Sequence, residues 1–170
     1  DESGDPGNTD DPSTWESFET AFNASQQQKG VDIGFVLTED DPYLAVDFDK
    51  VRDPETGETE DWVLEAVDRW GAYTEISPSG KGLHVWLKGV TEPDWWVDTD
   101  HIEVYDSGQY ITVTTKHYGD TPTRFATPSN FEQWLESRAE CVPEPPSQES
   151  QGGSVEYEVD INIDVYDVLS

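Results

Sequence analysis

The sequence predicts an α+β domain: an antiparallel or mixed sheet with helices packed on one face and an open face that holds a site. Segments with apolar residues at helical spacing alternate with short segments rich in valine, isoleucine and aromatic residues. Turn sequences such as Asp-Ser-Gly-Gln and Pro-Ser-Gly separate the short segments, as expected of neighbouring antiparallel strands. With 170 residues, including 7 Trp, 7 Tyr and 6 Phe, the chain can bury a core of its own.

Three helices are expected. The first begins in residues 11–22, with Asp11 or Ser13 as its cap, and its apolar face would consist of Trp15, Phe18 and Phe22. The second covers residues 60–70, and the third is a capped helix over residues 127–139. The inward face of the second helix is expected to comprise Trp62, Val63, Ala66, Val67 and Trp70.

Six strands are expected from alternating apolar residues bounded by turn sequences. They are residues 31–37, 43–49, 72–77, 83–88, 101–105 and 110–116. The last two flank Asp-Ser-Gly-Gln, so we expect them to form a hairpin.

Composition divides the chain into four parts. Residues 1–10 resemble a disordered acidic leader, and residues 11–140 contain all the periodic segments of the main domain. Residues 141–154 are rich in Pro, Ser and Gln and predict a flexible linker, and residues 155–170 predict the start of a further element or of a truncated downstream domain. No apolar run approaches the roughly 20 residues that cross a bilayer, so no membrane partner is expected.

Cysteine usage and charge restrict the setting. Cys141 is the only cysteine, which excludes an intrachain disulfide and a cysteine-based zinc site and fits a reducing cytoplasm. With 38 acidic and 9 basic residues, the net charge is −29. Three alternatives would each explain this charge: disorder, an acidic mimic or cation-binding protein, and a cytoplasm of molar salt. We favour the last, because a Debye length of about 3 Å at 1 M salt screens such self-repulsion.

Side-chain alternation along the strands predicts what the open face contains. Apolar residues alternate with polar ones in residues 43–49, 83–88 and 101–105. If the apolar side chains face the helices, one polar set collects on the opposite face: Asp47, Asp49, His84, Lys88 and Glu103. The same alternation in residues 110–116 places Lys116 opposite the apolar residues.

Asp47 and Asp49 form an Asp-x-Asp pair that would project two carboxylates side by side. Like charges so close are unfavourable unless a cation lies between them, and Mg²⁺ or Mn²⁺ prefers oxygen ligands. Glu103 would complete a two-metal site of the kind used in phosphoryl transfer. A chance Asp-x-Asp is the alternative in so acidic a chain.

A glycine-rich turn, Ser-Pro-Ser-Gly-Lys-Gly-Leu-His, lies between two of the strands. It contains Ser79, Gly80, Lys81 and Gly82, and it leads to His84. The turn is either an ordinary hairpin turn, with His84 a half-buried strand residue, or a phosphate-binding turn whose amides and lysine contact a triphosphate. Basic residues near these motifs favour the second interpretation: Lys50, Arg52, Lys81, Lys88 and Lys116.

The order of these motifs resembles the archaeo-eukaryotic primase superfamily, and in particular the primase-polymerase (prim-pol) domain of haloarchaeal plasmid and virus replication proteins. The matching motifs are, in order, Val-Asp-Phe-Asp, Ser-Pro-Ser-Gly-Lys-Gly-Leu-His and Ile-Glu-Val-Tyr. The resemblance covers roughly residues 11–140. The resemblance implies an RRM-like catalytic core and a DNA primase or polymerase. Such an enzyme would join nucleoside triphosphates on a single-stranded DNA template, with a helicase or zinc-binding module elsewhere in the full-length protein.

The resemblance also implies residue roles. Asp47, Asp49 and Glu103 would bind catalytic Mg²⁺ or Mn²⁺. His84 would act with them, and the nucleotide would contact His84 and the remaining set: Ser79, Gly80, Lys81, Gly82, Lys88 and Lys116.

The sequence also bears on other functions. The main alternative is a degenerate, non-catalytic nucleic-acid-binding module, since the segment with Trp95 and Trp96 has acids where relatives have basic residues. The two tryptophans would either stack on single-stranded bases or pack a loop, and we favour packing. A rolling-circle endonuclease would need paired histidines, which this chain lacks, and the glycine of residues 52–61 is misplaced for an EF-hand.

Overall fold

A computed structural model describes residues 7–27, 32–89 and 101–139 of the chain. The α+β class is confirmed: three α-helices and two antiparallel sheets occupy these ranges. The elements in chain order are η1 (Pro12–Thr14), α1 (Phe18–Gln27), β1 (Ile33–Leu37), β2 (Tyr43–Phe48), α2 (Asp61–Trp70), β3 (Thr74–Ile76), β4 (Leu83–Lys88), β5 (Ile102–Tyr105), β6 (Gln109–Val113) and α3 (Phe131–Ala139).

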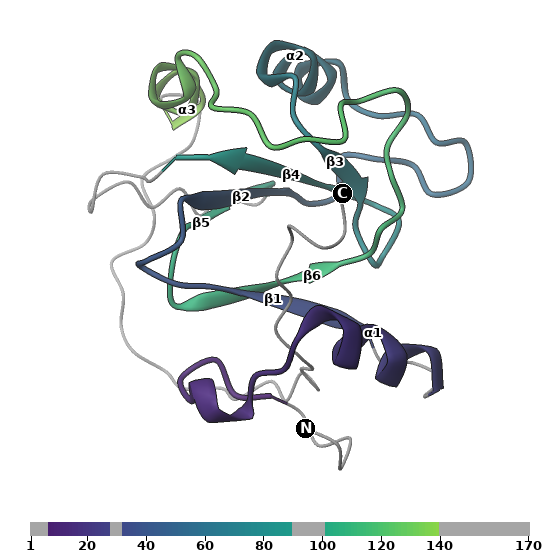
Figure 1. Ribbon diagram of the computed structural model, residues 1–170. Helices are drawn as coiled ribbons and strands as arrows, with labels where there is room; N and C mark the ends of the chain where they lie inside the picture. Colours follow the sequence, from purple (N-terminus) through teal and green to yellow (C-terminus); the bar gives the residue numbers. More distant parts are fainter. Residues whose placement is uncertain (1–6, 28–31, 90–100, 140–170) are drawn as a thin grey trace, which may run out of the picture.

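The larger sheet has four strands in the order β3-β4-β2-β5, and every neighbouring pair is antiparallel. Strands β1 and β6 pair with each other in a separate two-stranded sheet. Figure 1 shows α2 and α3 above the larger sheet, with β1, β6 and α1 below it. The larger sheet is therefore the central layer of the domain.

One face of the central sheet is the main hydrophobic core, as the strand alternation predicts. Apolar side chains of β2, β4 and β5 pack there against α2 and α3, including the fully buried Phe48 and Leu83. Phe48 lies within 6.0 Å, between ring centroids, of Trp62, Trp70 and Trp134. The prediction for α2 is confirmed, since its inward side chains Val63, Ala66, Val67 and Trp70 are buried and Trp62 packs against them.

The opposite face of the central sheet is only partly open, which corrects the predicted open face. A second core lies between this face and the β1–β6 sheet, and it buries Ala45 of β2 and Trp86 of β4 against Phe35 of β1. The covering sheet forms because β1 is buried throughout and β6 contributes Ile111 and Val113 to this second core. The two strands pair from Ile33↔Val113 to Leu37↔Gln109. Only part of the polar set predicted for this face therefore remains accessible.

Two local predictions are wrong. Strands β5 and β6 do not form a hairpin, because β5 pairs with β2 whereas β6 pairs with β1. The first helix is also not continuous from residue 11. Asp11 caps the short η1 segment, the chain is extended at Trp15, and α1 begins at Phe18. The Trp15 indole donates a hydrogen bond to the carbonyl of Asn8 instead of extending a helical face, and Phe22 is 41% exposed.

Some predicted segments fall at the margins of the described chain. Of the predicted leader only residues 7–10 are described, and there Asn8 hydrogen-bonds with Thr14 and Asp11. Trp95 and Trp96, the linker over 141–154 and the element over 155–170 lie outside the described residues. Within the described ranges, every helix is too short or too polar to cross a membrane.

Candidate functional site

Four polar residues lie in one row across the central sheet. The register pairs Glu75 of β3 with His84 of β4, His84 with Asp47 of β2, and Asp47 with Glu103 of β5. Directly opposed residues of antiparallel strands project from the same face, with Cβ atoms about 4.5–5.5 Å apart. The predicted neighbours Asp47, His84 and Glu103 are therefore brought together by three separate strands.

Asp47 lies at the centre of this row, and its side chain is 26% exposed. Its Oδ1 is 3.7 Å from Nε2 of His84. Burial raises the pKa of the Asp47 carboxyl, the negative charge of Asp49 raises it further, and His84 acts in the opposite direction. Asp47 and Asp49 are thus close enough to repel each other, as the Asp-x-Asp spacing predicts.

The other two predicted metal ligands, Asp49 and Glu103, have side-chain partners of their own. The Asp49 carboxylate is 3.1 Å from the Lys50 ammonium, and Glu103 accepts a hydrogen bond from the hydroxyl of Tyr105. Among residues 7–27, 32–89 and 101–139, no group of three or more acidic, histidine or cysteine side chains is arranged as a ready metal site. The donor chemistry nevertheless fits a hard divalent ion, because Asp49 and Glu103 are carboxylate neighbours of a partly buried Asp47 whose ionised form is disfavoured.

We expect Asp47→Asn to raise the thermal unfolding midpoint in metal-free buffer at neutral pH. The raised pKa of Asp47 means that the folded state holds its proton more tightly than the unfolded state. Asp47 therefore favours folding only below its unfolded value of about 3.8, and this contribution is lost as the pH rises through the folded pKa. Calorimetry of both proteins should show a gain at pH 7 that shrinks towards pH 3.5; a lower midpoint for the variant at pH 7 would contradict the burial argument.

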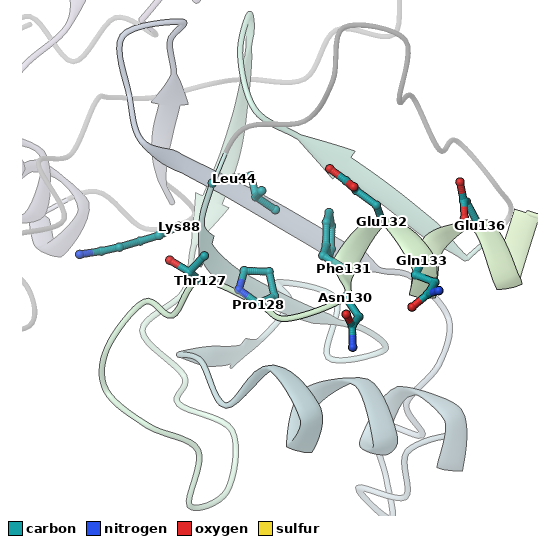
Figure 2. Close-up of a pocket in the computed structure, with 10 residues that line it drawn as sticks. Leu44, Lys88, Thr127, Pro128, Asn130, Phe131, Glu132, Gln133 and Glu136 are labelled. Atoms are coloured by element: carbon teal, nitrogen blue, oxygen red, sulfur yellow. The ribbon is translucent and has the colours of Figure 1, made fainter.

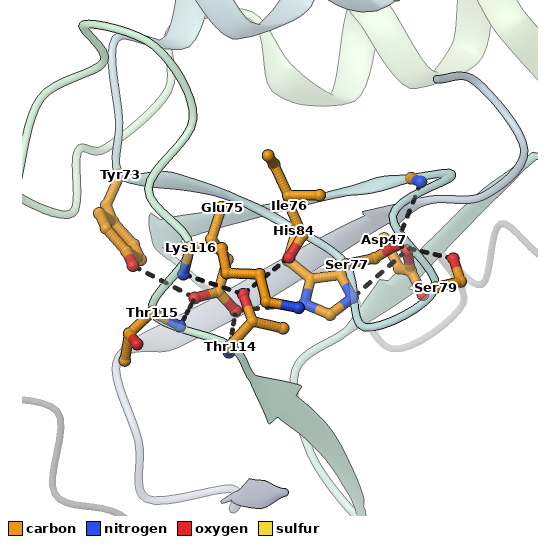
Figure 3. Close-up of polar contacts among 11 residues, drawn as sticks. Asp47, Tyr73, Glu75, Ile76, Ser77, Ser79, His84, Thr114, Thr115 and Lys116 are labelled. Carbon is orange, nitrogen blue, oxygen red and sulfur yellow. Dashed lines mark hydrogen bonds and ion pairs between the residues drawn. The ribbon is translucent and has the colours of Figure 1, made fainter. Parts of the chain in front are cut away.

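His84 is almost fully buried, at 3% exposure, and lies between two carboxylates. Its Nδ1 is 3.3 Å from Oε1 of Glu75, while its Nε2 faces Asp47 (Figure 3). Sequence reasoning missed Glu75. A signal was present, because a hairpin that pairs Ser77 with Gly82 places Glu75 opposite His84, two residue pairs further along the ladder.

The glycine-rich turn between β3 and β4 is closed by its own hydrogen bonds. The amide of Gly80 donates to the Ser77 carbonyl at 2.9 Å, that of Lys81 to the Ser79 hydroxyl at 3.2 Å, and that of Gly82 to the Ser77 hydroxyl at 3.1 Å. These amides are therefore not presented to a phosphate. Ser79 and Lys81 have exposed side chains, which can contact one.

Arg52 holds this turn from outside, a contact that sequence reasoning did not identify. Its Nη1 donates a hydrogen bond to the carbonyl of Gly80 at 2.8 Å, and its amide donates to the carbonyl of Lys81 at 2.8 Å. Arg52 follows β2 by four residues, so the segment that contains Asp49 also fixes the position of Lys81.

The two remaining predicted lysines lie in different places. Lys116 is exposed just beyond β6, and its carbonyl accepts a hydrogen bond from Ile76 of β3 at 2.8 Å, so its backbone lies beside the row. Lys88 is four residues from His84 along β4, about 13 Å away at the usual rise. It lines a separate pocket of about 530 Å³ with Leu44 and Glu132 (Figure 2). The structure therefore does not bring Lys88 to the site.

Comparison with known proteins gives one informative similarity. No family model matches the chain. Over 110 residues the chain is 36% identical to the DNA primase-polymerase of Nitratiruptor phage NrS-1. The matched region covers 61% of this chain and 15% of the phage protein, so the chain spans only a small part of that relative's length.

Proposed function

We propose that this domain is the catalytic part of a metal-dependent DNA primase-polymerase, which joins nucleotides on a single-stranded DNA template. The observation that supports it most is the pairing of Asp47 with Glu103 across adjacent strands, with Asp49 close enough to raise the pKa of Asp47. The similarity to a phage protein named a DNA primase-polymerase agrees with this proposal.

Asp47, Asp49 and Glu103 would hold the divalent ions, Mg²⁺ or Mn²⁺. When bound, such ions neutralise charge on the reacting phosphate. The side chains of His84, Ser79, Lys81 and Lys116 would contact the triphosphate, and the glycines Gly80 and Gly82 would shape the turn. A primer 3′-hydroxyl would attack the α-phosphate and pyrophosphate would leave, so the protein mainly orients the reactants and neutralises charge.

The cellular setting is part of the proposal. We place the domain in a plasmid or viral replication protein that acts beside a helicase or zinc-binding module, and the phage origin of the relative supports the viral setting. The coding sequence of the full-length protein tests this: helicase motifs or a set of zinc ligands are expected beside the domain. A full-length protein with neither would contradict it.

The net charge of −29 supports function in a high-salt cytoplasm, because salt screens repulsion among the 38 acidic residues. We expect template-directed incorporation of nucleotides with Mn²⁺ or Mg²⁺ to persist in KCl above about 1 M, where most phosphate-contacting enzymes lose DNA affinity. Primer extension measured from 0.1 to 3 M KCl checks both claims. No incorporation at any salt concentration would contradict the polymerase proposal, and activity confined to low salt would contradict the setting.

A non-catalytic nucleic-acid-binding module is the second candidate. It is favoured by the partners that Asp49 and Glu103 already have, and by the absence of a ready metal site among the described side chains. This candidate predicts binding of single-stranded DNA that neither a chelator nor added nucleotide changes. Binding that strengthens with divalent ions and nucleoside triphosphate would reject it.

A further inference from the structure

Glu75 is a fully buried carboxylate, with 0% exposure, at the end of the polar row. Its Oε1 accepts a hydrogen bond from the amide of Thr114 at 3.1 Å and lies 3.3 Å from Nδ1 of His84. Its Oε2 accepts hydrogen bonds from the amide of Thr115 at 2.9 Å and from the hydroxyl of Tyr73 at 3.2 Å. Four groups from three segments therefore converge on one side chain (Figure 3).

The Thr114–Lys116 segment is shaped around this carboxylate. Thr115 has φ +55, a left-handed conformation that costs a β-branched residue of the order of 1 kcal/mol or more. That conformation accompanies two successive amides aimed at the two oxygens of Glu75. The Thr114 hydroxyl also donates to the carbonyl of Ile76 at 2.7 Å. Glu75 and Ile76 of β3 thus fix the backbone of the segment that contains Lys116.

The same carboxylate fixes the imidazole of His84. Both Glu75 oxygens accept backbone N–H groups, so Glu75 also acts as an acceptor towards His84, and Nδ1 holds the proton between them. This contact directs the other ring nitrogen, Nε2, towards Asp47. Carboxylates that orient a histidine in this way decide which ring nitrogen faces the ligand. Because phosphate oxygens only accept hydrogen bonds, Nε2 must also carry a proton when it contacts a triphosphate.

We propose that Glu75 is a positioning residue for nucleotide binding: it holds the His84 ring and the Thr114–Lys116 segment so that His84 and Lys116 face the same triphosphate. This inference rests on the proposed function, because it assumes the nucleoside triphosphate that the proposed function uses as its substrate. Glu75 is buried and would touch no substrate, yet it connects two groups proposed to contact phosphate, His84 in β4 and Lys116 just beyond β6.

A purely structural role for Glu75 would be to join β3 to the end of β6, and it would affect stability alone. Tyr73 provides the matched control. Its hydroxyl donates to the same Oε2, and burial beside the negative Glu75 raises the Tyr73 pKa. Tyr73→Phe removes one hydrogen bond from Glu75 and leaves the ring that stacks on His117 at 5.3 Å. It removes no atom of the contact between Glu75 and His84.

The test is calorimetric titration of the wild-type chain, Glu75→Gln and Tyr73→Phe with dATP and Mg²⁺ in concentrated KCl. We expect Glu75→Gln to weaken dATP binding about 10- to 100-fold, as loss of an orienting carboxylate does at metal-bound histidines. We expect Tyr73→Phe to stay within about 2-fold, although both variants lower the unfolding midpoint. In primer extension, Glu75→Gln should raise KM for dATP more than it lowers kcat.

A nucleotide-free readout separates the two proposals. Long-range ¹H–¹⁵N NMR of the imidazoles should show a protonated Nδ1 for His84 in the wild type and in Tyr73→Phe, and a changed signal in Glu75→Gln. Wild-type dATP binding with no loss in Glu75→Gln, or an unprotonated Nδ1 in the wild type, would overturn the positioning role and leave the proposed function intact. No dATP binding by the wild type would overturn both.

Discussion

Asp47→Asn is expected to reduce template-directed nucleotide incorporation by at least about 100-fold, the scale on which loss of one charge-stabilising group slows an enzyme. Asp47 is the central acid of the row: His84 lies 3.7 Å away on one side, and Glu103 is its partner on the other. Asparagine keeps the shape of the side chain but removes the charge that a divalent ion requires. Primer extension with Mn²⁺ measures the loss.

The control for Asp47→Asn is Asp68→Asn, which makes the same charge change on the exposed face of α2. It should retain wild-type activity. Asp47→Asn should also unfold no earlier than the wild type in metal-free buffer, so its inactivity would not come from misfolding. Substantial extension by Asp47→Asn would reject Asp47 as a catalytic group.

Gly82→Ala is expected to destabilise the domain by about 3 kcal/mol or more, at the upper end of overpacking costs. A Cβ at Gly82 would lie 2.2 Å from the backbone oxygen of Phe48 and 3.2 Å from the Ser77 hydroxyl. The obstructing atom is backbone, so it cannot rotate away as a side chain would. Phe48 stands between Asp47 and Asp49, and moving its backbone would displace both acids along with the aromatic core.

Chemical denaturation and primer extension of Gly82→Ala check this expectation together. Gly80→Asn is the matched control in the same turn: the nearest atom to a Cβ there, on Pro54, is 3.6 Å away, and asparagine tolerates the φ of +74. We expect Gly80→Asn to cost about 1 kcal/mol or less. Equal stability of Gly82→Ala and wild type would show that the β2–β4 contact is looser than described.

The central sheet could be predicted because its signals are local and periodic. Alternation along residues 43–49 and 83–88 placed Phe48 and Leu83 in the core and Asp47 and His84 on the other face, and the structure shows this arrangement. Helix α2 is predictable for the same reason, since the residues of its apolar face lie close together in the sequence. The same alternation places Glu103 on the face of Asp47, and the structure adds that the two residues are direct partners across β2 and β5.

The features that could not be predicted depend on which distant segments of the chain lie side by side. Alternation shows which way a side chain points but not which strand lies beside it. The expected hairpin therefore pairs β6 with β5, whereas the partner of β6 is β1. Alternation also ignores distance along a strand, which is why Lys88 was grouped with His84. Glu75 went unnoticed because its meaning comes from His84 and from the amides of Thr114 and Thr115, 39 and 40 residues further along the chain.

The glycine-rich turn shows a different limit. Its composition is compatible with a phosphate-binding turn and with a closed hairpin turn, because both use glycine and serine. Only coordinates distinguish them, and here the Ser77 and Ser79 hydroxyls accept the amides of Gly82 and Lys81. Gly82 is required for close approach to Phe48, a reason that belongs to packing.

The most direct measurement is calorimetric titration of the wild-type chain with Mn²⁺ in concentrated KCl, with dATP present. If Asp47, Asp49 and Glu103 together bind catalytic ions, the isotherm should saturate at about one to two ions per chain. Asp47→Asn should abolish this saturable phase. A featureless isotherm for the wild type, or the same isotherm for both proteins, would contradict the metal site.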